Sequence, residues 1–210
     1  MLSIQNYNKR YTDRVILAID SLEIENQIYW VKGQNGSGKT TLFKSLSGII
    51  PFSGALSIDG FDLNKSPRDY RLLINYAEAD PVYPSFLTGR ELLDFYIESK
   101  SAYPAEAEQL LHFFGIENFI PSAVGTYSSG MLKKLSVLLA FIGKPRFILL
   151  DEPLVTIEHS FLPHIYQLIR RYNEEKKVGF LISSHQPLDS KYLSGYKTLT
   201  VANQTVICER

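Results

Sequence analysis

The 210-residue sequence predicts an α/β fold that carries a helical insertion. Three observations lead to this prediction. An apolar run at 28–31 enters a glycine-rich loop, after which residues 41–46 have helical character. The middle of the chain has apolar positions at helical spacing. Apolar runs at 146–150 and 178–183 flank another helix-like segment, and this alternation is typical of a parallel sheet covered by helices.

Short strands are predicted to dominate the first sixty residues. The apolar runs that indicate them are 2–4, 15–19, 22–24 and 28–31. The helix at 41–46 is expected to stop at Gly48, with Pro51 beyond it. Residues 54–60 indicate a further strand that ends in an Asp59-Gly60 turn, which favours a hairpin.

Helices are predicted to fill the middle of the chain, and strands are predicted to return after it. The helical segments are 89–99, 104–114 and 131–142. A fourth helix-like segment, 162–172, separates the two late apolar runs, and residues 198–207 indicate two short strands.

Composition indicates one globular domain over residues 1–210. Hydrophobic residues make up 45% of the chain, enough for a sizeable core. Lys plus Arg and Asp plus Glu both number 22, so no bulk attraction to nucleic acid is expected. The single cysteine, Cys208, suits a reducing compartment. No apolar run approaches the ~20 residues of a membrane span, so we expect the chain not to cross a membrane by itself.

Residues 33–40 read Gly-Gln-Asn-Gly-Ser-Gly-Lys-Thr and match the phosphate-binding loop pattern, between a strand and a helix as that pattern requires. The glycines let backbone N–H groups curl around phosphate oxygens. Lys39 would place its charge near the β- and γ-phosphates of ATP, and Thr40 would place its hydroxyl on Mg²⁺. The predicted nucleotide contacts in this loop are Gly33, Gln34, Asn35, Gly36, Ser37, Gly38, Lys39, Thr40 and Thr41.

Two neighbouring carboxylates end the apolar run at 147–152. Acids at the C-terminal edge of a buried strand lie beside the phosphate site in such folds. Asp151 is predicted to hold Mg²⁺ through its hydration shell, and Glu152 to orient or deprotonate the attacking water. The phosphate loop alone would leave kinases, GTPases and motor ATPases open.

A third segment, Tyr127-Ser128-Ser129-Gly130-Met131, opens a helix about twenty residues before the two acids. With the loop and the acids it resembles the ATPase domain of ATP-binding cassette (ABC) proteins, whose signature usually reads Leu-Ser-Gly-Gly-Gln. The resemblance implies that Ser128, Ser129 and Gly130 close over ATP held by the phosphate loop of a second subunit. The partner would be a second copy or a paired ABC ATPase subunit.

The resemblance extends to residues near both ends of the chain. Tyr11 stands where the family places an aromatic residue that stacks on adenine, with Tyr7 as a rival, and packing on the sheet is an equal alternative for either. His185 matches the family's switch histidine, which contacts the γ-phosphate. The fold implied is a P-loop NTPase core with a parallel sheet, an antiparallel β subdomain, and a helical subdomain at roughly 84–145.

The sequence departs from the family pattern in three places. No glutamine occurs between Leu73 and Glu91, where the family has one that helps to bind Mg²⁺; Glu78 or Ala79 stands there, and Glu78 could reach the metal. Glu158 takes the place of an aspartate in the loop that touches the opposite subunit. The signature carries Ser129 and Met131, a variant familiar in export-type transporters.

The resemblance implies a subunit that binds and hydrolyses ATP with catalytic residues Lys39, Glu152 and His185, dimerises on ATP, and powers a separate integral membrane permease, an exporter by its signature. It would be cytoplasmic and peripheral on the inner face of the cell membrane. The permease would dock in a groove beside 78–90, where Tyr83, Phe86 and Leu87 could receive a helix or could simply be core.

Other functions remain open at the level of sequence. One is a soluble ABC-type ATPase that acts on protein complexes or ribosomes. Another is a regulatory or assembly module that binds ATP but scarcely hydrolyses it. A P-loop kinase is disfavoured, because the signature and His185 would then be coincidences. The transported substrate is not encoded here, since specificity in this family resides mainly in the membrane partner.

Overall fold

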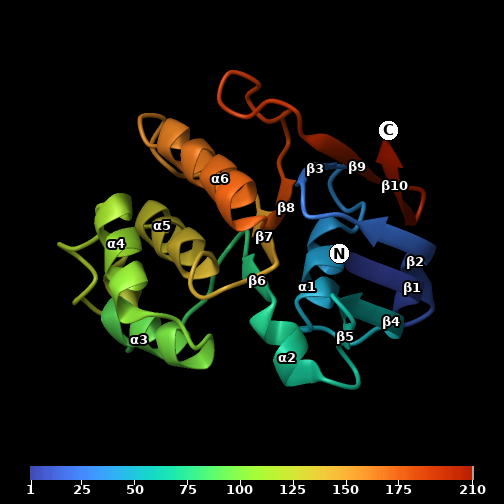
Figure 1. Cartoon of the computed structure of the whole chain (residues 1–210), viewed down its shortest axis with the longest axis horizontal. Helices are drawn as coiled ribbons and strands as arrows, with labels where there is room; N and C mark the ends of the chain where they lie inside the picture. Colours follow the sequence, from blue (N-terminus) through green and yellow to red (C-terminus); the bar gives the residue numbers. More distant parts are fainter. Residues whose placement is uncertain (210) are drawn as a thin grey trace.

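A computed structural model describes residues 1–209. Figure 1 shows two sheets and a group of helices that lies to one side of them. The strands are β1 (Leu2–Tyr11), β2 (Arg14–Ile24), β3 (Ile28–Lys32), β4 (Ser53–Ile58), β5 (Phe61–Asp62), β6 (Ile74–Ala77), β7 (Phe147–Asp151), β8 (Gly179–Ser183), β9 (Lys197–Ala202) and β10 (Thr205–Glu209). The helices are α1 (Lys39–Leu46), α2 (Pro67–Leu72), α3 (Gly89–Ser99), α4 (Pro104–Phe114), the 3₁₀ turn η1 (Val124–Thr126), α5 (Ser129–Ala140) and α6 (Leu162–Lys176).

The larger sheet has the order β10-β9-β3-β8-β7-β6, and every pairing in it is parallel except β9 with β10. All five residues of β7 and of β8 are buried. Strands buried on both faces have continuous apolar sequences, which is why these two were recognisable. The predicted α/β fold is therefore confirmed.

Two cores lie on opposite faces of this sheet because alternate residues of a strand point to opposite sides. Phe147 and Leu149 of β7 join a core with α1 and the antiparallel sheet. Ile148 and Leu150 join a second core with helices α3 to α6. The carboxyl end of β7 is thus held between two packed layers, so the acids that follow it have a fixed position.

The smaller sheet is antiparallel, with the order β2-β1-β4-β5. The two predicted strands 15–19 and 22–24 are one strand, β2, because β1 pairs with it from end to end. The predicted hairpin is confirmed: Asp59 and Gly60, with φ of 48° and 89°, join β4 to β5. Positive φ at both residues is the requirement of a type I′ turn.

The segment between β6 and β7 contains α3, α4, η1 and α5, and these helices lie together on the side of the molecule away from β1 and β2 (Figure 1). They fall within the predicted range 84–145. Asn75 of β6 is buried, and its amide donates to the carbonyl oxygens of Ala140 and Ile142, each at 2.8 Å. These bonds attach the C-terminal end of α5 to the sheet.

Three elements were not predicted: α2, the 3₁₀ turn η1, and β6 at the edge of the parallel sheet. α2 has only six residues, and β6 has four, of which one is the polar Asn75. Segments this short carry too few positions to reveal a period. Of the helices in residues 1–209, none has the length and apolar character needed to cross a bilayer.

Candidate active site

The phosphate loop connects β3 to α1, and its backbone is shaped by two glycines. Gly36 and Gly38 have φ of 77° and 108°, a region in which residues with a Cβ are strained. A Cβ on Gly33 would lie 2.5 Å from Ser37 Oγ and 2.6 Å from the carbonyl oxygen of Val201, so this position is sterically restricted to glycine. The loop therefore has the local structure that its sequence predicts.

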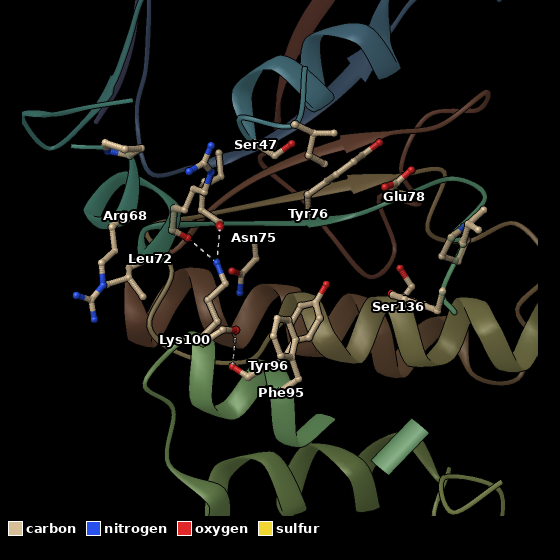
Figure 2. A pocket seen from close by; sticks show the side chains of 18 residues that line it. Ser47, Arg68, Leu72, Asn75, Tyr76, Glu78, Phe95, Tyr96, Lys100 and Ser136 are labelled. Carbon is tan, nitrogen blue, oxygen red and sulfur yellow. Dashed lines mark hydrogen bonds between the residues drawn. The ribbon is translucent and has the colours of Figure 1, made fainter. Parts of the chain in front are cut away.

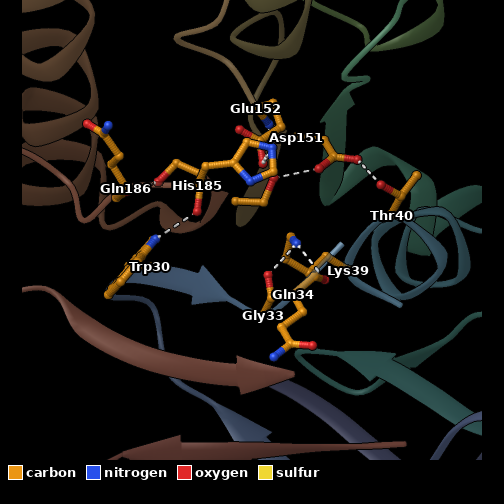
Figure 3. A network of polar contacts seen from close by, with 11 residues as sticks. Trp30, Gly33, Gln34, Lys39, Thr40, Asp151, Glu152, His185 and Gln186 are labelled. Atoms are coloured by element: carbon orange, nitrogen blue, oxygen red, sulfur yellow. Dashed lines mark hydrogen bonds and ion pairs between the residues drawn. The ribbon is translucent and has the colours of Figure 1, made fainter. Parts of the chain in front are cut away.

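Lys39 is buried and bends back over the loop, as Figure 3 shows. Its ammonium donates to the carbonyl oxygens of Gly33 at 2.8 Å and Gln34 at 3.3 Å. These bonds hold a positive charge at the centre of the loop, where backbone N–H groups at the start of α1 also attract an anion.

Asp151 is the best-connected acid of the site, with three side-chain partners. Thr40 Oγ1 donates to its Oδ2 at 2.7 Å, and Ser183 Oγ donates to its Oδ1 at 2.5 Å. The hydroxyl of Tyr76 lies 3.3 Å from Oδ2. Burial, followed by the charge of Asp151, raises the pKa of Tyr76, so the phenol stays protonated and can donate. The carboxylate is held in one orientation next to the phosphate loop.

Glu152 follows in a left-handed backbone conformation, with φ of 47°. A residue other than glycine seldom adopts this region, and here the Glu152 N–H is fixed by a 2.9 Å bond to Ser183 Oγ. The carboxylate of Glu152 is mostly buried, and its Oε1 lies 3.7 Å from Nε2 of His185. Figure 3 shows the two side chains next to each other above the phosphate loop.

One cavity of about 380 Å³ brings the predicted groups together. It is lined by Asn35 to Thr41 of the loop, Asp151, Glu152, His185 and, from β2, Ile16. Gly33 and Gln34 are outside its lining and contribute carbonyl oxygens to Lys39 instead. The buried Ser37 Oγ has no hydrogen-bond partner within residues 1–209. An unpaired buried hydroxyl, a nearby ammonium and a glycine-lined loop fit a phosphate group.

Glu78 does not lie where a metal ligand was predicted. Its carboxylate pairs with Lys44 Nζ of α1 at 3.1 Å and is absent from the cavity that Thr40 and Asp151 line. The chain turns away after β6, which carries the side chain of Glu78 to the outer side of α1. The structure thus does not bring Glu78 to Thr40 and Asp151, and its role as a metal ligand remains a prediction. The described residues, 1–209, contain no group of three or more His, Cys, Asp or Glu side chains arranged to hold a metal ion.

The two candidate adenine-stacking tyrosines have different environments. Tyr7 is buried, stacks on Phe52 with ring centroids 5.5 Å apart, and shares a 2.8 Å hydrogen bond with Ser45. Burial raises its pKa to about 12, so it is a core residue and the rival role was wrong. Tyr11 is 49% exposed at the end of β1, with the Lys9 ammonium 4.6 Å from its ring centroid. Its role remains a prediction.

The signature segment begins α5 and lies apart from the cavity of the same chain. Ser128 is the N-cap of α5 and accepts a 3.2 Å bond from the N–H of Met131, while Ser128 and Ser129 are exposed. A Cβ on Gly130 would lie 2.9 Å from the Thr156 carbonyl oxygen. Glu158, in the loop before α6, forms an ion pair with Lys134 of α5, with Nζ and Oε1 3.7 Å apart. The exposed side chains of Ser128 and Ser129 can contact another molecule.

Besides Ile16, which lines the cavity, the sequence analysis missed two residues that contact the acids of the site, Ser183 and Tyr76. Ser183 is fully buried at the carboxyl end of β8, two residues before His185. A hydroxyl at the end of an otherwise apolar run was the available signal. Tyr76 belongs to the unpredicted β6, so its position opposite Asp151 could not be anticipated.

Comparison with known families gives one match. Residues 20–155 match the family model described as ABC transporter. This range contains the phosphate loop, the signature segment and both acids.

Individual relatives agree with this match. The chain is 32% identical over 196 residues to the ABC transporter ATP-binding protein YybJ of Bacillus subtilis, covering 90% of this chain and 87% of that protein. It is 31% identical to human ATP-binding cassette sub-family A member 2, covering 99% of this chain but only 9% of that protein. The tungstate uptake system ATP-binding protein TupC of Peptoclostridium acidaminophilum is 29% identical, covering 88% of this chain and 86% of TupC.

Solved structures share the whole fold. A structure of the ATP-binding subunit of an ABC transporter superposes with a TM-score of 0.85 at 27% identity, covering 98% of this chain and 88% of that one. A dimeric structure of MJ0796, a bacterial ABC transporter cassette, superposes with a TM-score of 0.86 at 20% identity, covering all of this chain and 97% of that one.

Proposed function

We infer the function from one premise, that the chain belongs to the ABC transporter family and is an ATP-binding, ATP-hydrolysing domain of it. We propose that it is the energy-coupling subunit of a transporter, that it dimerises on ATP, and that it drives a separate integral membrane permease from the cytoplasmic side. The single observation that supports this most is the cavity in which the phosphate loop, Asp151, Glu152 and His185 meet.

The residues of the cavity divide the chemistry among them. Lys39 and the loop N–H groups would bind the phosphates, and the unpaired Ser37 hydroxyl would gain a partner there. Thr40 and Asp151 would hold Mg²⁺, with phosphate oxygens and water completing its coordination. Bound Mg²⁺ neutralises phosphate charge.

Glu152 would take a proton from water, a role supported by its carboxylate, which borders the cavity, and by its backbone, which Ser183 fixes. His185, 3.7 Å from it, would contact the γ-phosphate and keep the carboxylate directed at the water. Tyr11 would stack on the adenine from the exposed end of β1.

The signature segment supports dimerisation. Ser128, Ser129 and Gly130 begin a helix whose N-terminus attracts phosphate, yet they lie outside the cavity of their own chain. A second subunit would bring its own signature over each cavity. Dimeric structures of MJ0796, including a post-hydrolysis state bound to ADP and Pi, have the same fold.

The test is steady-state ATPase activity of the purified chain. Glu152→Gln keeps the size of the side chain and removes the base, so we expect kcat to fall by a factor of about 10² or more while ATP still binds. Light scattering should then detect an ATP-dependent dimer. Binding without hydrolysis or dimerisation by the unaltered chain, even with membranes from its source, would support a nucleotide-dependent regulatory module instead.

A groove of about 590 Å³ offers the permease a docking surface. Figure 2 shows it between the helices α1 and α2 on one side and α3 on the other. Its apolar wall contains Tyr83, Tyr96 and the exposed side chains of Val82 and Phe95. Phe86 is exposed but outside the groove, and Leu87 packs against the core, so the predicted surface is only partly the one found.

The groove is also lined by basic residues, Arg68 and Arg71 of α2 and Lys100 at the end of α3. Burial, reinforced by the charge of Arg71, lowers the pKa of Lys100 to about 8. A short amphipathic helix with an acidic residue at one end would match the apolar and the basic residues of this lining. We propose a cytoplasmic segment of the permease as the occupant.

Docking is tested by capture of an integral membrane protein from detergent-solubilised membranes of the source with a tagged chain. Phe95→Asp puts a charge on the apolar wall, so recovery of that protein should fall at least tenfold. Phe86→Asp adds the same charge at an exposed position outside the groove and is the matched control. Equal recovery with both variants would place docking elsewhere.

We propose export as the direction of transport, on the Ser-Ser-Gly-Met signature alone. Transport into vesicles would measure the direction.

A further inference from the structure

Lys133 is a fully buried lysine that the proposed mechanism does not use. It lies on α5 with only 2% of its surface exposed. Lysine is rarely buried unless its ammonium is paired, because removal of the charge from water is costly. The side chain therefore calls for an explanation in terms of what it contacts.

The ammonium of Lys133 donates to two main-chain carbonyl oxygens in the loop that follows β6. One belongs to Glu78, at 3.0 Å, and the other to Ala79. Burial lowers the pKa of Lys133, and the carboxylates of Asp80, Asp151 and Glu152 oppose that shift. The ammonium of Lys133 thus joins helix α5 to the main chain of the 78–80 loop.

The two segments that Lys133 joins have different places in the proposed mechanism. α5 carries the signature at its start, five residues before Lys133. The 78–80 loop leads from β6 to the apolar wall of the docking groove, and Ser136, one turn further along α5, also lines that groove. Figure 2 shows Glu78 and Ser136 on facing sides of it.

We propose that Lys133 is the positioning residue that links the docking groove and the 78–80 loop to the signature helix. This inference rests on the proposed function and deepens it. The side chain of Glu78 pairs with Lys44 and cannot make the link. Lys133 makes this link instead, because its side chain on α5 donates to the main chain of the loop.

If Lys133 only stabilised the fold, its replacement would lower the stability of the protein and leave kcat unchanged. A positioning role predicts that kcat falls while the KM for ATP changes little, because the phosphate loop does not contact Lys133. Lys133→Met keeps an unbranched side chain and removes both the donors and the charge. We expect kcat to fall at least tenfold with less than a threefold change in KM, and Lys133→Arg to restore part of kcat.

Asn75→Leu is the matched control, because Asn75 joins β6 to the end of α5 that is far from the signature, whereas Lys133 joins α5 to the loop after β6. We expect it to lower the melting temperature at least as much as Lys133→Met does, and to change kcat less than threefold. All variants are assayed at a temperature where circular dichroism shows them folded. An unchanged kcat in Lys133→Met, or an equal loss in Asn75→Leu, overturns the proposal.

A second measurement does not depend on turnover. In the Glu152→Gln background, Lys133→Met should raise the protein concentration needed for the ATP-dependent dimer at least tenfold, measured by analytical ultracentrifugation. Unchanged dimerisation together with unchanged kcat leaves Lys133 a structural residue. If Glu152→Gln itself neither loses activity nor traps a dimer, the proposed function has failed, and that result is distinct from failure at Lys133.

Discussion

Ser183 shows how one buried hydroxyl can position two acids. It donates to Asp151 Oδ1 at 2.5 Å and accepts from the N–H of Glu152 at 2.9 Å. The second bond helps to hold Glu152 in its left-handed backbone conformation. A single serine therefore keeps the metal-binding acid and the base of the proposed mechanism in register.

Replacement of this serine should cost both stability and activity. Ser183→Ala leaves an acceptor and a donor buried without partners, so we expect a loss of about 1–3 kcal/mol in the free energy of unfolding. We also expect kcat to fall at least tenfold, because Glu152 loses its fixed direction. Urea unfolding and an ATPase assay measure the two effects.

Ser45→Ala is the control for this prediction. Ser45 is also fully buried and hydrogen-bonded, to Tyr7, but lies away from the cavity. It should lose stability and keep its kcat. If Ser183→Ala behaves as Ser45→Ala does, then Ser183 does not position the acids.

Site residues that belong to continuous motifs could be predicted from the sequence. Contacts between residues on neighbouring strands could not. Asn35 to Thr41 of the loop, Asp151, Glu152 and His185 meet in one cavity, while Gly33 and Gln34 lie outside its lining. Tyr76 reaches Asp151 only because β6 pairs with β7 in parallel, with Tyr76 beside Leu149. Glu78, three residues from the unpredicted Asn75, was misplaced for the same reason: the path of the chain there depends on tertiary contacts.

Helix α3 begins with a capping box. Thr88 Oγ1 accepts from the Glu91 N–H at 3.1 Å, and a carboxylate oxygen of Glu91 accepts from the Thr88 N–H at 2.8 Å. The hydrogen bonds from the Thr88 backbone and side chain lower the pKa of Glu91 below its usual 4.5. The helix that carries one wall of the docking groove is thus stabilised at its first turn.

This cap makes a prediction about pH. A carboxyl group with a depressed pKa contributes stability above its unfolded value near 4.5, and that contribution disappears as the pH falls through the folded value. Glu91→Ala should therefore melt at a lower temperature than the unaltered chain at pH 7. Below pH 4.5 the two curves should converge, as measured by circular dichroism. A gap that persists undiminished at pH 3 would show that the charge is not involved.

Elements with many residues were predicted well, and short or context-dependent ones were not. The observed α3 and α4 have the predicted bounds, and β7 and β8 lie within one or two residues of theirs. The division of β2 into two strands was wrong because local apolarity lapses at Asp20 and Ser21, while pairing with β1 continues through them. Strand length here is decided by the partner strand, which a single local segment does not reveal.

At the scale of the whole molecule, the proposed mechanism needs two chains for each active site. Lys39 is in the cavity, whereas Ser128 faces away from it on the exposed start of α5. Specific activity should therefore rise with protein concentration until the dimer saturates.

Mixing two inactive variants tests this arrangement directly. Lys39→Ala removes the loop ammonium, and Ser128→Arg blocks the signature. Each variant alone should be inactive, whereas a mixture should regain activity, at most about a quarter of the original, because mixed dimers contain one intact site. An inactive mixture would contradict a site shared between chains, provided that native mass spectrometry detects the mixed dimer.

The attachment of α5 has a mechanical consequence. Asn75 ties the last turn to the sheet, and the first turn carries the exposed Ser128 about 18 Å away along a twelve-residue helix. Asn75 holds the last turn and Lys133 holds the middle of the helix, so the turn that contains Ser128 is the least attached. Amide exchange should therefore be fastest near Ser128 and slowest near Ala140. A second subunit that contacts the first turn of α5 would reduce this motion. The conformational entropy lost in this way weakens subunit association, but it does not weaken the binding of ATP to a single chain.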